Sequence, residues 1–390
     1  MTSPTTPTSA VRWPLAEQGS GKTRSVLVVR LDSVGDVLLA GPAVRAVAAG
    51  PSRVVLLAGP RGRPAARLLP GVDKVLTWHC PWVDPEPDPV RRADVLRAAD
   101  MIAAEQADRA VIFTSYHQDP LPTALLLRLA GVPHITAAPE DYPGALLDVR
   151  HRLPAGDQGH AGGPHEVERM LSVAAAAGFP PPRDTRLRLT TPLPSAAGVV
   201  QGEGYVVVHP GASVPARAPV PELCAGYVTA LARDGWRVVV TGSPAEQDLT
   251  RRVAGSRGLD LGGRTGLALL ASVMAGAAAV VTGNTGPAHL AAAVGTPVVS
   301  LFAPTVRLGA WRPWGVPHVV LGGQDAPCAG SRARECPVPG HPCLAAVTAS
   351  QVTEAVRHLA GNGPAESGAR AGTGQDESLK VPDESLGVSA

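Results

Sequence analysis

The chain has 390 residues, of which 45% are hydrophobic and 17% are charged, and its formal net charge is +2. This length predicts two domains, and the hydrophobic content excludes a disordered chain. The small net charge argues against a protein that binds nucleic acid or an anionic membrane, and aromatic residues, at 3%, are too few for single-strand stacking platforms.

The first 23 residues are polar and rich in Pro and Thr, so we expect them to be disordered. They contain GSGKT (residues 19–23), the second half of a P-loop motif, but Ala16 stands where the first glycine belongs and the strand follows the motif instead of preceding it. A P-loop is therefore disfavoured. We find no pattern of a secretion signal or membrane span and expect a cytoplasmic protein, with at most peripheral contact at the inner face of the plasma membrane.

Residues 24–194 have the pattern of a first α/β domain. Short apolar strands alternate with Ala- and Leu-rich helical stretches, which predicts a parallel sheet covered on both faces. The expected strands are residues 25–31, 53–59, 74–78 and 109–115, and the expected helices are residues 37–49 and 92–107. Residues 154–165 have loop composition and precede a helix that ends near residue 177.

A second series of strands and helices predicts another doubly wound domain over residues 195–360. Its strands are expected in YVVVHPG, WRVVVTG, a short segment near residue 259, AAVVTG and TPVVSLFAP. Residues 361–390 form a polar, low-complexity tail that we expect to be disordered. Two such domains would face each other across a cleft, the place where open α/β sheets bind ligands.

The junction VRLDSVGD (residues 29–36) follows the first predicted strand. Ser33 and Asp36 have the spacing of a capping box, so both could serve only to start a helix. Alternatively, Asp36 is a catalytic base, because the N–H groups of a helix start favour a carboxylate that can accept a proton from a substrate hydroxyl. Gly35 would let the substrate approach the backbone closely. The residues alone leave both interpretations open.

Three later junctions are candidates for binding a nucleotide. In VTGNTGPAHLAAAVGTP, a strand and turn precede a helix whose free N–H groups near Thr285 and Gly286 suit an anion, with His289 as a further donor. After HPGASVP, Arg217 could neutralise a diphosphate. In TGSPAEQD, Glu246 could accept ribose hydroxyls. An ordinary turn, a solvated arginine and a second capping box, respectively, would also explain these features.

These stretches together resemble glycosyltransferase family 9, the ADP-heptose:lipopolysaccharide heptosyltransferases and their relatives. The resemblance covers roughly residues 25–359 and rests on four motifs in the order of the family. The motifs are VRLDSVGDVLLAGPAVRA, VVVHPGAS, VVVTGSPAE and GNTGPAHLAAAVGTPVVSLFAPT. It implies a GT-B fold, in which two Rossmann-like doubly wound domains face an interdomain cleft.

The resemblance also implies roles for particular residues. Asp36 matches the catalytic aspartate of the family, with Gly35 on the acceptor side. The donor-binding positions fall on Ser213, Arg217, Glu246, Thr285, Gly286 and His289. Two departures stand out: Asn284 occupies the place of an aspartate found in many members, and RAPVP (residues 217–221) lacks the tryptophan of the family pattern.

A late cluster contains Cys328, Cys336, His341 and Cys343. A zinc site with three thiolates and one imidazole is chemically possible, but Ser331 stands where a second cysteine would complete a paired spacing, which disfavours structural zinc. The resemblance implies catalysis without a metal ion, so we expect no cofactor besides the nucleotide-diphospho-sugar itself.

The sequence therefore predicts an inverting glycosyltransferase that moves a heptose or hexose to a saccharide or glycolipid acceptor of the cell envelope, as in lipopolysaccharide core biosynthesis. We expect a monomer that binds no nucleic acid. The alternatives are a sugar-nucleotide epimerase or hydrolase on the same fold and a non-catalytic sugar-nucleotide-binding protein. A dehydrogenase is disfavoured, because VRLDSVGD lacks the G-x-G-x-x-G turn.

Overall fold

The structure, a computed structural model, describes residues 24–50, 52–153 and 163–361. The two segments expected to be disordered, except Gly361, and most of the expected loop 154–165 lie outside the described residues. The chain divides into two compact units. One comprises the described residues up to Pro192 together with Gly309–Gly315, and the other comprises Leu193–Leu308 and the described residues from Val316. No described helix combines the length and apolar character needed to cross a bilayer.

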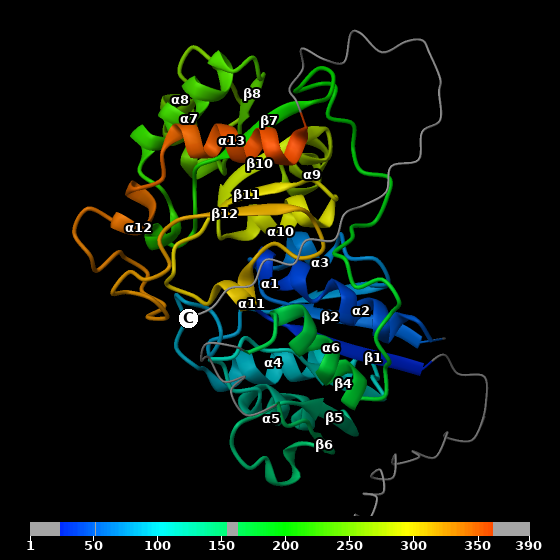
Figure 1. Cartoon of the computed structure of the whole chain (residues 1–390). Coiled ribbons are helices and arrows are strands. Elements are labelled where there is room, and N and C mark those ends of the chain that lie inside the picture. Colours follow the sequence, from blue (N-terminus) through cyan, green and yellow to red (C-terminus); the bar gives the residue numbers. More distant parts are fainter. Residues whose placement is uncertain (1–23, 51, 154–162, 362–390) are drawn as a thin grey trace, which may run out of the picture. The chain divides into compact units, whose positions relative to one another are not determined.

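The first unit contains a parallel sheet with helices on both faces (Figure 1). Its strands are β1 (Arg24–Arg30), β2 (Ser52–Ala58), β3 (Lys74–Thr77), β4 (Arg109–Ile112), β5 (His134–Ala137) and β6 (Val149–Arg150). Its helices are α1 (Val34–Leu39), α2 (Gly41–Ala48), α3 (Arg63–Ala66), α4 (Arg92–Ala103), α5 (Leu121–Leu129), the 3₁₀ turn η1 (Gly144–Leu146) and α6 (Glu166–Ala176). The helix α11 (Leu308–Trp311) falls mostly in this unit.

The strand order in this sheet is β3-β2-β1-β4-β5-β6. The chain first winds outward from β1 through β2 to β3 and then returns to the other side of β1 with β4. The direction of winding thus reverses between β1 and β4, which makes this the topological switch point, where ligands bind outside the carboxyl ends of the strands. The loops that follow Arg30 and Ile112 flank this point.

Alternating residues of the central strand pack against the helices. Leu27 and Val29 of β1 belong to a core with Ile102 of α4 and Leu127 of α5, all buried. Burial of each such side chain is worth roughly 1.5–3 kcal/mol, which fixes the register of β1 and therefore the position of Arg30 at its carboxyl end.

The helix expected over residues 37–49 is two helices, α1 and α2, that meet at Ala40. Pro42 is the cause, because proline has no N–H to donate to the carbonyl of Leu38. The helix expected over residues 92–107 ends at Ala103, and Gln106 adopts a positive φ of 48°. The strands expected to reach residues 78 and 115 end earlier, at Thr77 and Ile112.

The second unit contains a similar parallel sheet. Its strands are β7 (Tyr205–His209), β8 (Val238–Val240), β9 (Gly258–Asp260), β10 (Ala277–Gly283), β11 (Val298–Leu301) and β12 (His318–Leu321). Its helices are α7 (Pro221–Arg233), α8 (Gln247–Ala254), α9 (Leu267–Ala275), α10 (Gly286–Ala293), α12 (Pro342–Ala345) and α13 (Ala349–Ala360), with 3₁₀ turns η2 (Pro215–Arg217) and η3 (Pro244–Glu246).

The strand order of the second sheet is β12-β11-β10-β7-β8-β9, so its switch point lies between β7 and β10. Helices α7 and α13 pack together on one face (Figure 1). Tyr227 of α7 donates a hydrogen bond at 3.0 Å to the carbonyl of Val347, which precedes α13. The prediction of two doubly wound α/β sheets is confirmed.

Candidate active site

Asp36 lies beside the switch point of the first sheet, in the first turn of α1. Its Oδ2 accepts hydrogen bonds from the Ser33 backbone N–H at 3.2 Å and from the Ser33 hydroxyl at 2.6 Å, so the predicted capping interaction is present. Its Oδ1 accepts a bond from Nη2 of Arg30 at 3.1 Å. The side chain remains 15% exposed. The carboxylate is therefore held at both oxygens and still reaches the surface, and capping does not exclude a chemical role.

Arg30, the last residue of β1, is fully buried behind Asp36. Its Nη2 also donates to the hydroxyl of Ser115 at 2.9 Å, and its Nε lies 3.1 Å from Oδ2 of Asp32. Because Ser115 follows β4, this guanidinium joins the two loops that flank the switch point. Burial lowers the pKa of Arg30, but the charges of Asp32, Asp36 and Glu166 raise it by more, so the side chain stays a cation.

Asp32 is the second carboxyl group at this point. Burial raises the pKa of Asp32 to about 6, the charge of Arg30 opposes this rise and the charge of Asp36 adds to it. Its Oδ1 accepts a hydrogen bond from the amide of Gln118, whose own Oε1 accepts from the Ser115 backbone N–H at 3.2 Å. The site thus contains two carboxyl groups in different environments, of which Asp36 is the one held by a helix start.

Two charged residues of α6, Glu166 and Arg169, are also buried near Arg30. Glu166 and Arg169 are 1% and 7% exposed, and Oε1 and Nη1 are 3.5 Å apart. Burial raises the pKa of Glu166, while the charges of Arg169 and Arg30 lower it. The first unit therefore concentrates five ionisable groups around the end of β1.

Sequence reasoning had singled out Asp36 and Gly35 but not Arg30, Asp32 or Glu166. A signal for Arg30 was present, because a charged residue within the apolar strand SVLVVR must find a partner if it is buried. Glu166 and Arg169 belong to a helix with ordinary amphipathic spacing, and only the tertiary structure brings them to β1.

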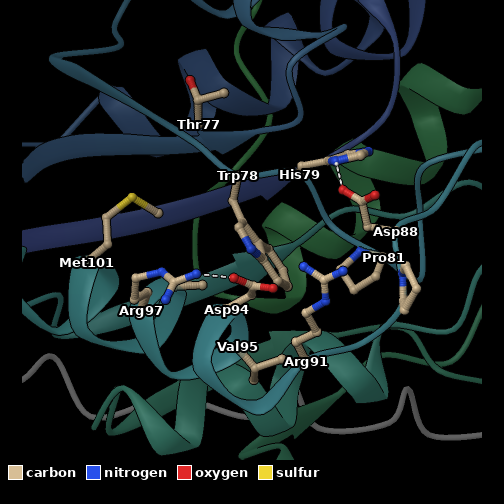
Figure 2. A pocket seen from close by; sticks show the side chains of 12 residues that line it. Thr77, Trp78, His79, Pro81, Asp88, Arg91, Asp94, Val95, Arg97 and Met101 are labelled. Carbon is tan, nitrogen blue, oxygen red and sulfur yellow. Dashed lines mark hydrogen bonds and ion pairs between the residues drawn. The ribbon is translucent and has the colours of Figure 1, made fainter.

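A pocket of about 380 Å³ opens beyond the carboxyl end of β3. Figure 2 shows the Trp78 indole in its middle, with the charged side chains of Arg91 and Asp94 nearby. At the rim, Nδ1 of His79 lies 3.2 Å from Oδ2 of Asp88, and Arg97 pairs with Asp94. Its volume falls within the range of roughly 300–1,000 Å³ that is usual for small-molecule sites.

The second sheet presents the start of α10 beside its own switch point. Thr285 is the N-cap residue, yet its side chain makes no capping hydrogen bond, and its buried hydroxyl has no hydrogen-bond partner among the residues that the structure describes. Pro287 lies in the first turn, and His289 is 4% exposed. The helix start beside Gly286 is therefore not capped by its own N-cap side chain, which suits an anion.

The contacts of Asn284 explain why this chain has an asparagine where many family members have an aspartate. Its Nδ2 donates to the carbonyl of Ala303 at 3.2 Å, and its Oδ1 accepts from the N–H of Ala303 at 3.1 Å. An amide can both donate and accept, whereas an ionised aspartate only accepts. This residue thus ties the ends of β10 and β11 together and holds the turn before Thr285.

Glu246 ends η3, the turn that follows β8, and lies next to the loop that follows β7. A Cβ atom on Gly211 would be 1.9 Å from its Oε1, so the carboxylate lies directly against the backbone of that loop. Its Oε2 accepts from the Ser243 N–H at 2.7 Å, which forms the predicted capping box. Burial lowers the pKa of His209 to about 4, although the charge of Glu246 opposes this shift, and Nδ1 of His209 is 2.9 Å from the hydroxyl of Thr241.

Arg217 ends η2, and its carbonyl oxygen would be 2.6 Å from a Cβ on Gly283. Glycine at that position is therefore required by the close approach of two loops. Ser213 is exposed in the same loop. The predicted donor residues of the second unit thus follow three consecutive strands of the sheet, β8, β7 and β10, at their carboxyl ends.

The late cysteines are free, with Cys328 and Cys343 buried and Cys336 half-buried. Burial raises the pKa of Cys343, and the neighbouring thiols of Cys328 and Cys336 add to this rise. Within the described part of the chain, no group of three or more His, Cys, Asp or Glu side chains is placed to hold a metal ion, and this includes the three cysteines with His341.

Each of the two doubly wound units thus presents a candidate site beside its switch point, a held carboxylate in the first and a helix start without a side-chain cap in the second. A family model, "Glycosyltransferase family 9 (heptosyltransferase)", matches residues 96–341, which is more than half of the chain. The chain belongs to glycosyltransferase family 9, and it is a glycosyltransferase.

The relatives agree with this assignment. Lipopolysaccharide heptosyltransferase 1 of Pseudomonas aeruginosa is 28% identical over 367 residues, covering 86% of this chain and 90% of the relative. The structure of Escherichia coli ADP-heptose lps heptosyltransferase II has a TM-score of 0.67 at 20% identity, covering 86% of this chain and 98% of that one. A family 9 glycosyl transferase from Veillonella parvula gives the same TM-score at 18% identity, covering 86% and 97%. The similarity to these structures confirms the GT-B fold.

Proposed function

We propose that this protein transfers a heptose or hexose from a nucleoside-diphosphate sugar to a hydroxyl group of a cell-envelope saccharide or glycolipid, with inversion at the anomeric carbon. The observation that carries the proposal is the pair of sites at the two switch points. One unit offers a partly exposed carboxylate that is held in place, and the other offers an uncapped helix start.

In the proposed reaction, Asp36 takes the proton of the acceptor hydroxyl. The resulting oxygen nucleophile bonds to the anomeric carbon of the donor as the bond from that carbon to the diphosphate oxygen breaks. One displacement at this carbon gives inversion, and the nucleoside diphosphate leaves with the electron pair of the broken bond. The contacts of Asp36 with Arg30 and Ser33 orient its carboxylate for this proton transfer.

The leaving diphosphate needs positive potential where its charge develops. We assign this to the start of α10 at Thr285 and Gly286, with His289 in the same turn and Arg217 in the neighbouring loop. Glu246 accepts the ribose hydroxyls of the donor. Glu246 follows β8, and Arg217 follows the neighbouring strand β7, whose loop Glu246 contacts at Gly211.

We assign the acceptor to the first unit. The pocket around Trp78 follows β3, and Asp36 follows β1, so both lie at the carboxyl edge of one parallel sheet. An indole face suits the C–H groups of a sugar ring, and a rim with both acidic and basic side chains can accept from and donate to sugar hydroxyl groups (Figure 2).

ADP-heptose is the first donor to test, because relatives of this chain carry it in their names. The purified protein is mixed with ADP-heptose or another nucleoside-diphosphate sugar and with envelope glycolipid fragments, and proton NMR follows the anomeric configuration of the product. We expect the opposite configuration from that of the donor, and transfer that persists in excess EDTA. Retention of configuration, or sugar isomerisation without an acceptor, would contradict the proposal.

A further inference from the structure

Arg30 is a buried cation at the end of an apolar strand, where the stability of the core does not require a charge. The residues before it in β1, Val26 to Val29, are apolar and buried. An apolar side chain of similar volume can often replace a buried ion pair without loss of stability, because desolvation of the charges offsets their attraction. The guanidinium therefore points to a task other than holding the core together.

The contacts of Arg30 lead to three different segments. Its Nη2 bonds both Oδ1 of Asp36 in α1 and the hydroxyl of Ser115 after β4, while its Nε lies against Asp32 in the loop after β1. A planar guanidinium offers donors in fixed, divergent directions, which a single ammonium group cannot reproduce. The geometry suits the positioning of a carboxylate, not only the neutralisation of its charge.

Asp36 is held from two sides as a result. Ser33 binds one oxygen and Arg30 binds the other, so the plane of the carboxylate is fixed while its edge stays 15% exposed. The other charged groups that face Arg30 are Asp32 and, from α6, Glu166, which pairs with Arg169.

We propose that Arg30 is a positioning residue that fixes the orientation of Asp36 and keeps its carboxylate ionised. The proposal rests on the role that we propose for Asp36 as the base. Arg30 touches no reacting atom in this account and acts only through Asp36. Ser115 accepts a hydrogen bond from the same Nη2 that binds Asp36, and so the proposal extends to it as a weaker contributor.

The first experiment measures the titration of the Asp36 carboxyl group in the absence of substrate. The protein is labelled with ¹³C at the aspartate carboxyl groups, the Asp36 resonance is assigned by its loss in Asp36→Asn, and its titration is followed by NMR. Removal of the adjacent positive charge in Arg30→Gln should move the titration midpoint to higher pH, and Arg30→Lys should move it less. Because Arg30→Lys keeps the charge, it provides a folded variant if Arg30→Gln does not fold.

The second experiment measures turnover and its pH dependence, with ADP-heptose as the donor. We expect Arg30→Lys to lower kcat by at least about ten-fold, because small misplacements of a catalytic group are costly, with the acid limb of the pH–rate profile displaced to higher pH. Ser115→Ala should show a smaller loss in the same direction. Arg45→Lys is the control, because Arg45 is a partly buried arginine of the same unit that bonds the carbonyls of Asp184 and Arg186 and not Asp36.

An unchanged Asp36 titration in folded Arg30→Gln and Arg30→Lys would overturn the proposal. So would a loss of kcat that Arg45→Lys matches, since this would indicate a merely structural effect. If Asp36→Asn keeps full turnover while the NMR titration still responds to Arg30, the proposed function fails, and the positioning of Asp36 by Arg30 stands without a catalytic consequence.

Discussion

The Asn284 side chain makes two hydrogen bonds with the backbone of Ala303, one as donor at 3.2 Å and one as acceptor at 3.1 Å. Both partners are buried, and the pair joins the ends of β10 and β11 just before the turn that starts α10. The shape of the proposed diphosphate site therefore depends on an amide that is not itself assigned to the ligand.

Asn284→Asp should destabilise the protein by about 1–3 kcal/mol near neutral pH, because an ionised carboxylate would face the Ala303 carbonyl. At low pH a protonated aspartate can donate to that carbonyl, so part of the loss should be recovered. Urea unfolding at pH 5 and pH 8 measures both effects. Asn284→Ala is the control, because it loses both bonds at either pH, and an equal pH response of the two variants would contradict this account.

Gly211→Ala tests the placement of Glu246. The new methyl group would meet Oε1 at 1.9 Å, and the flexible end of the glutamate can move away. We therefore expect little loss of stability but clearly weaker binding of the nucleoside-diphosphate sugar, measured by calorimetry. Gly226→Ala in α7 is the control, since nothing lies within 4 Å of its Cβ and alanine should stabilise the helix by about 0.5–1 kcal/mol. Unchanged affinity in Gly211→Ala would remove Glu246 from the donor site.

His209 should contribute to acid sensitivity. Burial lowers the pKa of His209 from 6.5 to about 4, so between these values the unfolded chain binds a proton that the native state does not. The stability contribution is fully present above about pH 6.5 and is lost as the pH falls through about 4, at most about 3 kcal/mol. His209→Gln should reduce this loss in chemical unfolding measured across the window. The surface variant His358→Gln should not, and a wild-type acid slope in His209→Gln would contradict the assignment.

Much of the fold could be predicted from the sequence, because buried parallel strands are recognisable as short apolar runs. In the second sheet, β7, β8, β10 and β11 coincide with such runs. Strands β5, β6 and β12 were not predicted, because they have two to four residues each and mixed polarity. The boundary between α1 and α2 was not predicted either, since the effect of Pro42 competes there with a continuous helical pattern.

The candidate site could be predicted only in part. Asp36, Thr285 and Gly286 stand at strand-to-helix junctions, where local sequence reveals a cap or a helix start. The assembly around Arg30 was not predictable in this way, because Ser115 is 85 positions away in sequence and meets it only through the pairing of β1 with β4. Nor could the sequence show that Gly309–Gly315 belongs to the first unit, where the carbonyl of Arg312 lies 2.9 Å from Nε2 of His165.

The most direct test of the account compares the turnover of Asp36→Asn with that of the wild type. Asparagine preserves size and some capping ability but removes the charge that faces the buried Arg30, so the loss of stability should exceed the roughly 1 kcal/mol of a lost cap, and turnover is compared in folded protein. Gln351→Ala is the matched control, because it removes the corresponding residue of the capping box at α13. We predict that kcat of Asp36→Asn falls by about 10²–10⁴-fold with donor affinity retained, while Gln351→Ala keeps its turnover. Near-wild-type turnover in folded Asp36→Asn would show that Asp36 only caps α1 and would contradict the account.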